Sequence, residues 1–306
     1  MALQTKNLAN PYRGRFAPSP TGPLHFGSLV AAVASFLQAR ANRGQWLIRI
    51  EDIDPPREMA GAADDILRRL DRLGLHWDEP VLYQSTRTDA YRDAIEQLSR
   101  AGAVYRCGCS RREIADSSLW GIDGPVYPGT CRNGLRHDRE EHALRVRTDI
   151  VPIVFEDRWQ GRFESVPERD FGDFIVRRAD GLSAYQLAVV VDDAAQDITE
   201  VVRGADLLLS TPRQLHLQRL LGVATPAYAH FPVVVDTAGE KLSKQTGARS
   251  IGDEGTVPLL RDVLRFLGQR IPTDIDADDV DGLWRFAVPA WDPEQVPRMR
   301  SAPMPA

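Results

Sequence analysis

The sequence lacks the features of a secreted, membrane-bound or repetitive protein. Its 306 residues include only three cysteines, an odd number that argues against a disulfide scaffold and for a reducing compartment. No apolar run approaches the roughly 18 residues that a membrane-spanning helix needs. Residues 1–14 are polar and lack the apolar core of a secretion signal, and no internal repeat is visible. We therefore expect a soluble, cytoplasmic protein with one large α/β domain or two modest ones.

The chain also lacks an overall basic charge. Its formal net charge is −5, so the molecule as a whole does not attract nucleic acid. Any RNA partner must be met by local basic patches, such as the arginine pairs at 68–69, 111–112 and 177–178. Taken singly, each pair is more typical of a solvated surface.

The most informative stretch is residues 15–28, RFAPSPTGPLHFGS, which combines a strand end, a proline-stiffened loop and a helix start. The spacing of Gly22 and Gly27 imitates a P-loop, but the Lys-Ser/Thr that should follow is absent. His25 and the N-terminus of the apolar helix that follows can instead hold a phosphate. On composition alone, a Pro/Gly-rich connection with an incidental histidine is an equal alternative.

Alternating strand and helix signals predict a parallel sheet. A strand at 45–50 follows the apolar helix at 29–37, which makes a βαβ unit. The acidic residues 51–54 then lie at the carboxyl end of a parallel strand, where open α/β sheets place ligands. Further strands are expected at 81–84, 144–147, 151–155, 174–177, 198–204 and 231–235, and further helices at 60–73, between the cap at 85–86 and Gly102, from a cap at 210–211 to Gly222, and at 258–267.

Two expectations concern the second half of the chain. Residues 187–191, LAVVV, favour a fully buried strand that delivers Asp192 and Asp193 at its end. The last thirty or so residues are rich in proline and acid and show no clear core pattern.

A second functional stretch, EKLSKQT at residues 240–246, follows the last predicted strand. Lys241 and Lys244 make a cationic loop that can close on a polyphosphate and stabilise charge as a bond to its α-phosphorus breaks. Taken alone, this pattern is better explained as a solvated turn.

Paired with the loop around His25, the lysine loop is similar to the two signatures of class I aminoacyl-tRNA synthetases in their glutamyl version. Residues 49–57, 184–193 and 200–206 also resemble glutamyl-type enzymes, and the resemblance covers about residues 13 to 270. Only about sixty residues follow the lysine loop, whereas glutamyl-tRNA synthetases continue into a long helical anticodon-binding region. The chain therefore resembles the truncated paralogues in this family, and its Phe26 and Gln245 fit them.

The resemblance implies a ligase that activates L-glutamate with ATP and Mg²⁺ without needing tRNA. It then transfers the glutamate to queuosine in the anticodon loop of tRNA(Asp), and we expect it to act as a monomer. Two alternatives stay open: a nucleotidyltransferase acting on another small acid, and a non-catalytic RNA-binding paralogue.

The same resemblance implies the site residues. Arg15 and Arg203 suit the carboxylates of glutamate, Glu51 its ammonium group, and Tyr185 a neutral hydrogen bond. The full glutamate site would comprise Arg15, Phe16, Ala17, Pro18, Ser19, Glu51, Tyr185 and Arg203. The ATP site would comprise His25, Gly27, Ser28 and Lys244, and the catalytic groups would be His25, Lys241 and Lys244.

The three cysteines, Cys107, Cys109 and Cys131, leave a tetrahedral zinc site one ligand short. Spacing alone suggests His137 or His142 as the fourth ligand. The family pattern instead implies Tyr127, four residues before the last cysteine, and we follow it. The site would hold one structural Zn²⁺, and the alternative is three unconnected buried thiols.

The fold class expected is α/β: a Rossmann-like parallel-sheet catalytic domain of the class I synthetase type. Its two halves would be residues 1–102 and 173–255, separated by an inserted zinc-binding α+β subdomain at 103–172. A short helical tail at 256–306 would replace the anticodon-binding domain.

Overall fold

Helices and strands alternate along most of the chain, as the pattern predicts. The computed structural model describes residues 11–116, 120–135, 140, 143–236, 255–272 and 275–304. The strands are β1 (Arg13–Phe16), β2 (Gln45–Ile50), β3 (Leu82–Tyr83), β4 (Val104–Cys107), β5 (Ala143–Val146), β6 (Ile153–Asp157), β7 (Gly161–Ser165), β8 (Phe174–Arg177), β9 (Glu200–Gly204), β10 (Ala227–Phe231), β11 (Val233–Val235) and β12 (Ser301–Pro303). The helices are α1 (Phe26–Ala41), α2 (Ala62–Arg72), α3 (Thr88–Arg100), α4 (Arg111–Ala115), α5 (Pro167–Asp170), α6 (Tyr185–Ala195), α7 (Thr211–Leu221), α8 (Thr256–Phe266) and α9 (Val280–Ala290).

The parallel strands come from both halves of the chain. Strands β1, β2 and β3 pair in parallel, and so do β9, β10 and β6. The two groups meet where β1 lies beside β9, because Thr199 exchanges hydrogen bonds of 2.9 Å with the backbone N–H and C=O of Arg13. The expected α/β fold with a parallel sheet is confirmed.

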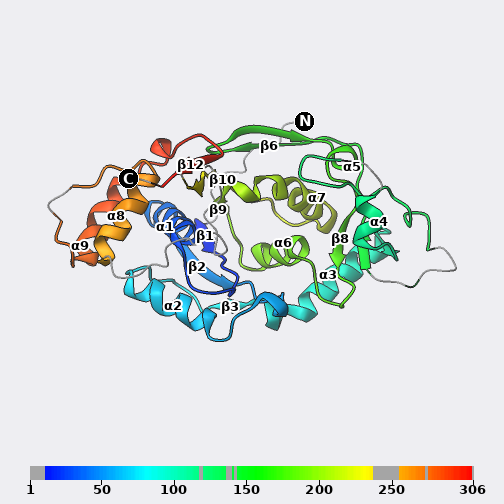
Figure 1. Cartoon of the computed structure of the whole chain (residues 1–306), viewed down its shortest axis with the longest axis horizontal. Coiled ribbons are helices and arrows are strands. Elements are labelled where there is room, and N and C mark those ends of the chain that lie inside the picture. Colours follow the sequence, from blue (N-terminus) through cyan, green and yellow to red (C-terminus); the bar gives the residue numbers. More distant parts are fainter. Residues whose placement is uncertain are drawn as a thin grey trace.

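Helix α1 crosses between β1 and β2 and lies at the centre of the larger hydrophobic core. Strands β1, β2 and β9 cover one side of it, and α8 and α9 contact it as well. In Figure 1, α8 and α9 lie at one end of the long axis and α4 lies toward the other. This enclosure explains why the sequence of α1 is too apolar for a surface helix.

The predicted insertion at residues 103–172 contributes strands to two different sheets. Strands β4 and β5 form an antiparallel sheet with β8, which lies beyond residue 172. The hairpin of β6 and β7 instead joins the parallel sheet through β10. Residues 103–172 therefore do not form a self-contained sheet, because their strands pair with β8 and β10 outside the segment.

The predicted strand at residues 187–191 is wrong, because these residues belong to α6. A short buried apolar run cannot be assigned to strand or helix by periodicity alone, and here packing against α3 and α7 overrides the β-preference of valine. On a helix, successive side chains point about 100° apart. Asp192 therefore meets Tyr91 of α3, whereas Asp193 meets Arg49 of β2.

The expectation that the last thirty residues lack a core is also wrong. Helix α9 buries Leu283, Trp284 and Ala287 against the α1 core, and β12 pairs with β11. The indole N–H of Trp284 donates to the carbonyl of Leu73 at 2.8 Å, and that of Trp291 donates to Gln38 at 2.8 Å. The apolar positions recur every three or four residues, so the helical signal was present beneath the prolines and acids.

Smaller differences concern ends of elements. The predicted strand at 231–235 is two strands, because Pro232 between them has no N–H to donate. Helix α3 begins at Thr88, since residues 84–87 form a 3₁₀ turn ahead of it and no side-chain cap is made by Ser85 or Thr86. Among the described residues, no helix is both long enough and apolar enough to cross a membrane.

Candidate functional site

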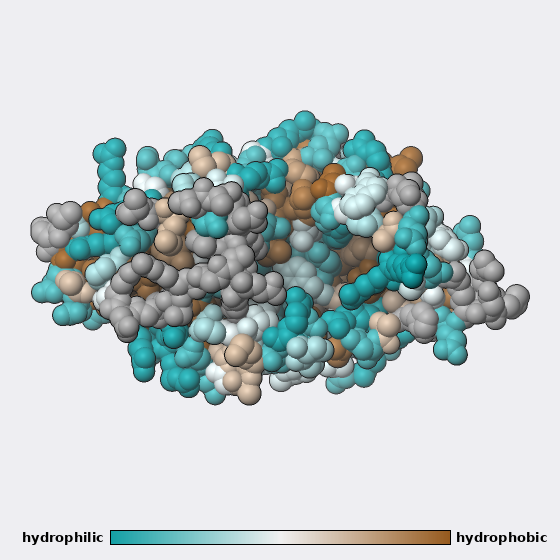
Figure 2. Space-filling model, in the orientation of Figure 1, coloured by the Kyte–Doolittle hydropathy of each residue, from teal (hydrophilic) through white to brown (hydrophobic). Residues whose placement is uncertain are grey.

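A cavity of about 250 Å³ opens beyond the carboxyl ends of β1 and β2, and its walls come from both halves of the chain. Ser19 and Glu51 follow β1 and β2, and Tyr185 begins α6. Figure 2 shows a hollow near the middle of one face, with apolar side chains visible between hydrophilic rims. The cavity is smaller than the roughly 300–1,000 Å³ typical of drug-sized sites, so it suits a molecule the size of an amino acid.

Four buried charged side chains lie beside this cavity. Asp193 of α6 accepts hydrogen bonds from Arg15 at 3.1 Å and Arg49 at 2.7 Å, and Arg49 also reaches Glu51 at 3.4 Å. Their exposed fractions are 4 % for Arg15, 0 % for Arg49, 9 % for Glu51 and 5 % for Asp193. We call these four residues the Arg49 cluster. Two guanidinium groups and two carboxylates balance one another in it.

Burial and pairing act against each other on the two carboxylates. Burial favours the protonated form of Asp193, but the charges of Arg15 and Arg49 outweigh it and hold its pKa below the usual value. For Glu51, burial prevails over the same two arginines and the pKa is raised. Asp193 is therefore the firmly ionised member of the Arg49 cluster.

Arg203 reaches the same region from β9. It is 5 % exposed, and its charge and that of Arg15 lie close enough to lower the pKa of Tyr185, which burial nevertheless raises. Its Nε donates to His230 and its Nη2 to Thr211, both at 2.9 Å. Among the described residues, its Nη1 is buried and has no hydrogen-bond partner. A buried cationic donor without a partner is costly unless a ligand completes it.

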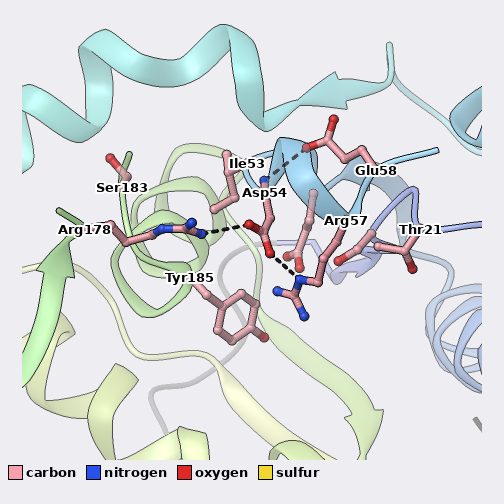
Figure 3. Close-up of a pocket in the computed structure, with 10 residues that line it drawn as sticks. Thr21, Ile53, Asp54, Arg57, Glu58, Arg178, Ser183 and Tyr185 are labelled. Carbon is pink, nitrogen blue, oxygen red and sulfur yellow. Dashed lines mark hydrogen bonds and ion pairs between the residues drawn. The ribbon is translucent and has the colours of Figure 1, made fainter. Parts of the chain in front are cut away.

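An ion-pair bridge lines the cavity, and its central carboxylate, Asp54, is half-buried. Figure 3 shows Asp54 between Arg57 and Arg178, with Tyr185 on the same side of the pocket. The bond from Arg178 is 2.9 Å, and the two arginines lower the pKa of the Asp54 carboxyl. This bridge joins the loop after β2 to the turn after β8. The sequence had placed Asp54 among the acidic residues at a strand end and Arg178 in a basic pair, but it did not predict that they bind each other.

The other residues predicted to bind glutamate lie at the end of β1 and in the loop after it. Phe16 ends the strand and is buried, and the backbone carbonyl of Pro18 accepts a 3.0 Å hydrogen bond from the N–H of Glu51. Ala17 is half-buried and Ser19 is exposed at the cavity. The loop therefore lies against the end of β2.

The N-terminus of α1 is held by His25. As the N-cap residue, His25 accepts the N–H of Ser28 at Nδ1 (3.2 Å), and its Nε2 lies 3.0 Å from the Ser28 hydroxyl. Strand β11 lies beside this turn, since a Cβ on Gly27 would stand 3.9 Å from Val234. The strand preceding the lysine loop thus ends near His25, but Lys241 and Lys244 themselves lie outside the described residues.

The three cysteines form one cluster at the end of β4 in the small antiparallel sheet. The sulfurs of Cys107, Cys109 and Cys131 lie within 4.8 Å of one another, and those of Cys109 and Cys131 are 3.6 Å apart. The phenol oxygen of Tyr127 is 3.4 Å from Cys107 Sγ and 3.6 Å from Cys109 Sγ. We call these four residues the cysteine cluster. The predicted alternatives His137 and His142 lie outside the described residues.

The distances of 3.4 to 3.6 Å within the cysteine cluster are close to the edges of a tetrahedral zinc site. With Zn–S bonds of about 2.3 Å and a Zn–O bond of about 2.0 Å, tetrahedral edges are about 3.8 Å between sulfurs and about 3.5 Å from sulfur to oxygen. Burial raises the pKa of the Cys109 thiol to about 11 and raises that of Tyr127. These groups therefore stay protonated unless a cation binds them. A bound metal ion would displace their protons, so the donor set fits a metal site.

One arginine supports the cysteine cluster. Arg145 of β5 is 5 % exposed, donates from Nε to Cys107 Sγ at 3.3 Å and stacks over the Tyr127 ring at 3.9 Å. Burial raises the pKa of Cys107, but contacts that include Tyr127 and Arg145 outweigh it, so the net shift is downward. Sequence reasoning missed Arg145, because no spacing links it to the cysteines.

Of the ten residues that line the cavity, the sequence predicted three as site residues, Ser19, Glu51 and Tyr185. The structure brings Arg15, Glu51, Tyr185 and Arg203 to one region. The sequence did not predict that Arg49 and Asp193 bind one another, because a strand at 187–191 would have placed Asp193 at a sheet edge.

The matching family model is described as tRNA synthetases class I (E and Q), catalytic domain, and it covers residues 12–267. Relatives named glutamyl-Q tRNA(Asp) synthetase are similar over nearly the whole chain. The protein of Dechloromonas aromatica is 56 % identical over 98 % of this chain and 100 % of its own length. That of Chromobacterium violaceum is 53 % identical over 94 % and 95 %.

Solved structures agree with the fold. A glutamate tRNA ligase from Elizabethkingia meningosepticum, in complex with its amino acid, has a TM-score of 0.79 at 23 % sequence identity. The match covers 97 % of this chain and 68 % of that one. At this identity the likeness shows a shared fold.

Proposed function

Because the chain belongs to the class I tRNA synthetases for glutamate and glutamine, we propose that it activates L-glutamate with ATP in the absence of tRNA and transfers it to queuosine in the anticodon loop of tRNA(Asp). The enzyme is a ligase of the glutamyl-tRNA synthetase type. The names of its relatives support the choice of tRNA(Asp). We further propose that it acts as a monomer in the cytoplasm.

The observation that carries the proposal is the charge arrangement around the 250 Å³ cavity. Glutamate brings two carboxylates and one ammonium group. The unpartnered Nη1 of Arg203 suits a carboxylate, and Arg15 adds a second positive charge close to Tyr185. Glu51 lines the cavity and suits the ammonium group. Phe16, Ala17, Pro18 and Ser19 would shape the wall beside them.

In the proposed reaction, the α-carboxylate of glutamate attacks the α-phosphorus of ATP in line and displaces pyrophosphate. His25 and the first turn of α1, with Gly27 and Ser28, would hold the phosphates at a helix N-terminus. Lys241 and Lys244 would stabilise charge on the phosphates as the bond breaks. Mg²⁺ bound to ATP would neutralise phosphate charge. Catalysis then consists of positioning and charge stabilisation, with no protein nucleophile.

We propose a structural role for one Zn²⁺, held by Cys107, Cys109, Tyr127 and Cys131. The closeness of the three sulfurs and the phenol oxygen supports it, and so does the burial of Cys107 and Cys131. The metal would hold the loop that carries Tyr127 and Cys131 against β4.

The first experiment measures ATP–pyrophosphate exchange without tRNA. We expect exchange with L-glutamate and little with aspartate or glutamine. The side chain of aspartate is one methylene shorter and would not reach the same arginine, and the side chain of glutamine carries no charge to pair with it. A second experiment measures transfer of labelled glutamate to tRNA(Asp) with and without queuosine. Equal labelling of both RNAs would contradict the queuosine proposal, and exchange with an unrelated small acid alone would favour a different nucleotidyltransferase.

The lysine loop can be tested separately, because Lys6, Lys241 and Lys244 are the only lysines in the sequence. We expect ATP to protect Lys241 and Lys244, and not Lys6, from a lysine-specific acylating reagent read out by mass spectrometry. Equal labelling of all three with and without ATP would remove the lysine loop from the proposed site.

A further inference from the structure

Three neighbouring strands each contribute one buried polar side chain to a continuous row. Asp157 ends β6, His230 lies in β10, and Arg203 lies in β9 directly opposite His230 in the parallel register. Each residue is at most 5 % exposed. Asp157 Oδ2 lies 2.5 Å from His230 Nδ1, and His230 Nε2 lies 2.9 Å from Arg203 Nε. Neither Asp157 nor His230 has a part in the proposed chemistry.

The two ends of the row determine the tautomer of His230. A guanidinium group only donates, so His230 Nε2 must accept from Arg203. His230 Nδ1 therefore carries the proton and donates it to the Asp157 carboxylate. Burial lowers the pKa of His230 to about 4, so the ring stays neutral near pH 7.

The row also determines which donors of Arg203 remain available. His230 takes Nε, and Thr211 takes Nη2 at 2.9 Å. The guanidinium group lies over the Tyr228 ring, 5.5 Å from its centroid. Nη1 is then the only nitrogen of this group without a partner among the described residues.

We propose that Asp157 and His230 are positioning residues, which hold Arg203 in the orientation that presents Nη1 to the carboxylate of the amino acid. This rests on the proposed function, in which Arg203 binds glutamate. The carboxylate of Asp157 sets the tautomer of His230, and that tautomer presents an acceptor to Arg203. The pair therefore acts on glutamate affinity and leaves the ATP site unaffected.

The backbone contacts of Asp157 make His230 the better residue for a test. Asp157 Oδ1 also accepts the N–H groups of Trp159 and Gln160, at 3.1 and 2.9 Å, so it stabilises the turn after β6. Replacing Asp157 affects both the turn and the row. Replacing His230 affects only the row and the packing around it.

The experiment compares His230→Leu with the conservative His230→Gln in tRNA-independent exchange. In His230→Gln, the side-chain oxygen reaches the place of Nε2 and still accepts from Arg203. We expect His230→Leu to raise the KM for glutamate at least about tenfold, since a misplaced binding group is costly, while the KM for ATP stays within about twofold. We expect His230→Gln to restore the glutamate KM to within about threefold of the original.

Asp157→Asn provides a spectroscopic readout that does not depend on activity. Its amide can donate to Nδ1 and would shift the proton of His230 to Nε2, where it faces a donor of Arg203. In ¹⁵N spectra of histidine-labelled protein, with His230→Gln used to assign the signals, we expect an Nδ1–H tautomer in the original chain and its loss in Asp157→Asn.

Each outcome bears on a different statement. If the original chain shows no glutamate-dependent exchange, the proposed function fails. If it exchanges but His230→Leu leaves the glutamate KM unchanged, or His230→Gln is as impaired as His230→Leu, the positioning role is overturned. An Nε2–H tautomer in the original chain also overturns it. If His230→Leu does not fold, the KM of His230→Gln and the Asp157→Asn spectrum still decide.

Discussion

The Arg49 cluster and the cysteine cluster are both polar sites inside the protein that an arginine contacts, yet they differ in how their charges are balanced. In the Arg49 cluster, Arg15 and Arg49 face Asp193 and Glu51, so opposite charges balance inside the protein. In the cysteine cluster, three thiols and a phenol lie beside the guanidinium group of Arg145, and no carboxylate is among its four members. The first cluster balances its charges without a ligand, whereas the second would gain stability from the metal proposed for it.

The largest effect is expected from breaking the Arg49 cluster. Asp193→Asn leaves Arg15 and Arg49 buried with one opposite charge between them, so we expect a loss of about 3–5 kcal/mol in the free energy of unfolding. Urea denaturation followed by tryptophan fluorescence measures it. The matched control is Arg100→Ala, which breaks the exposed pair with Glu96 and should cost about 0.3–0.5 kcal/mol. A loss below 1 kcal/mol for Asp193→Asn would show that the cluster does not depend on charge balance.

Metal removal should distinguish the two clusters next. A strong chelator should lower the thermal midpoint of the original chain by several degrees, at roughly 2–8 °C per kcal/mol. Cys131→Ser should bind less than one equivalent of zinc and should show no further decrease with the chelator. Asp193→Asn should keep the chelator response of the original chain.

Replacing the phenol tests the fourth ligand. We expect Tyr127→Phe to weaken zinc binding, measured by competition with a chromophoric chelator, because one tetrahedral ligand is lost. Unchanged zinc affinity would remove Tyr127 from the ligand set and return His137 and His142 to consideration.

A smaller effect is expected from Arg145. Arg145→Gln removes the cation beside Cys107, and we expect zinc affinity to fall by about 10-fold, at the low end for residues behind metal ligands. Arg145→Lys keeps the charge and should lose less. Arg106→Gln, on the exposed face of β4, is the control and should leave the affinity unchanged. Equal affinities for all three variants would show that the guanidinium group serves packing alone.

The smallest effect is a pH dependence of the Asp193 contribution. Its folded-state pKa is lowered, so its contribution to stability is complete above the unfolded value of about 3.9 and is lost as the pH falls through the folded value. The stability difference between the original chain and Asp193→Asn should therefore be constant from pH 7 to about pH 5 and shrink below about pH 4. Glu51 has the opposite sign, because its pKa is raised. A difference that grows on acidification would contradict the pairing.

The local pattern was sufficient where one segment carries both the element and the functional group. The strand at 45–50, the helix after His25 and the acidic residues 51–54 lie as predicted, because each depends on a short run of neighbours. The pattern failed at residues 187–191, where the same valine run suits either a buried strand or a buried helix. It also failed in α9, where prolines and acids concealed the apolar face.

By itself, the sequence determined the parallel α/β fold and the type of enzyme, and it supplied the residues proposed for glutamate, ATP and a metal. These follow from motifs whose residues are close together in the chain. Only the tertiary structure decided which charges meet. Arg49 meets Asp193 and Arg203 meets His230 across separations of 144 and 27 residues, and such contacts depend on how strands and helices pack. Burial then sets the cost of leaving any of these groups unpaired, and burial is a property of the whole fold.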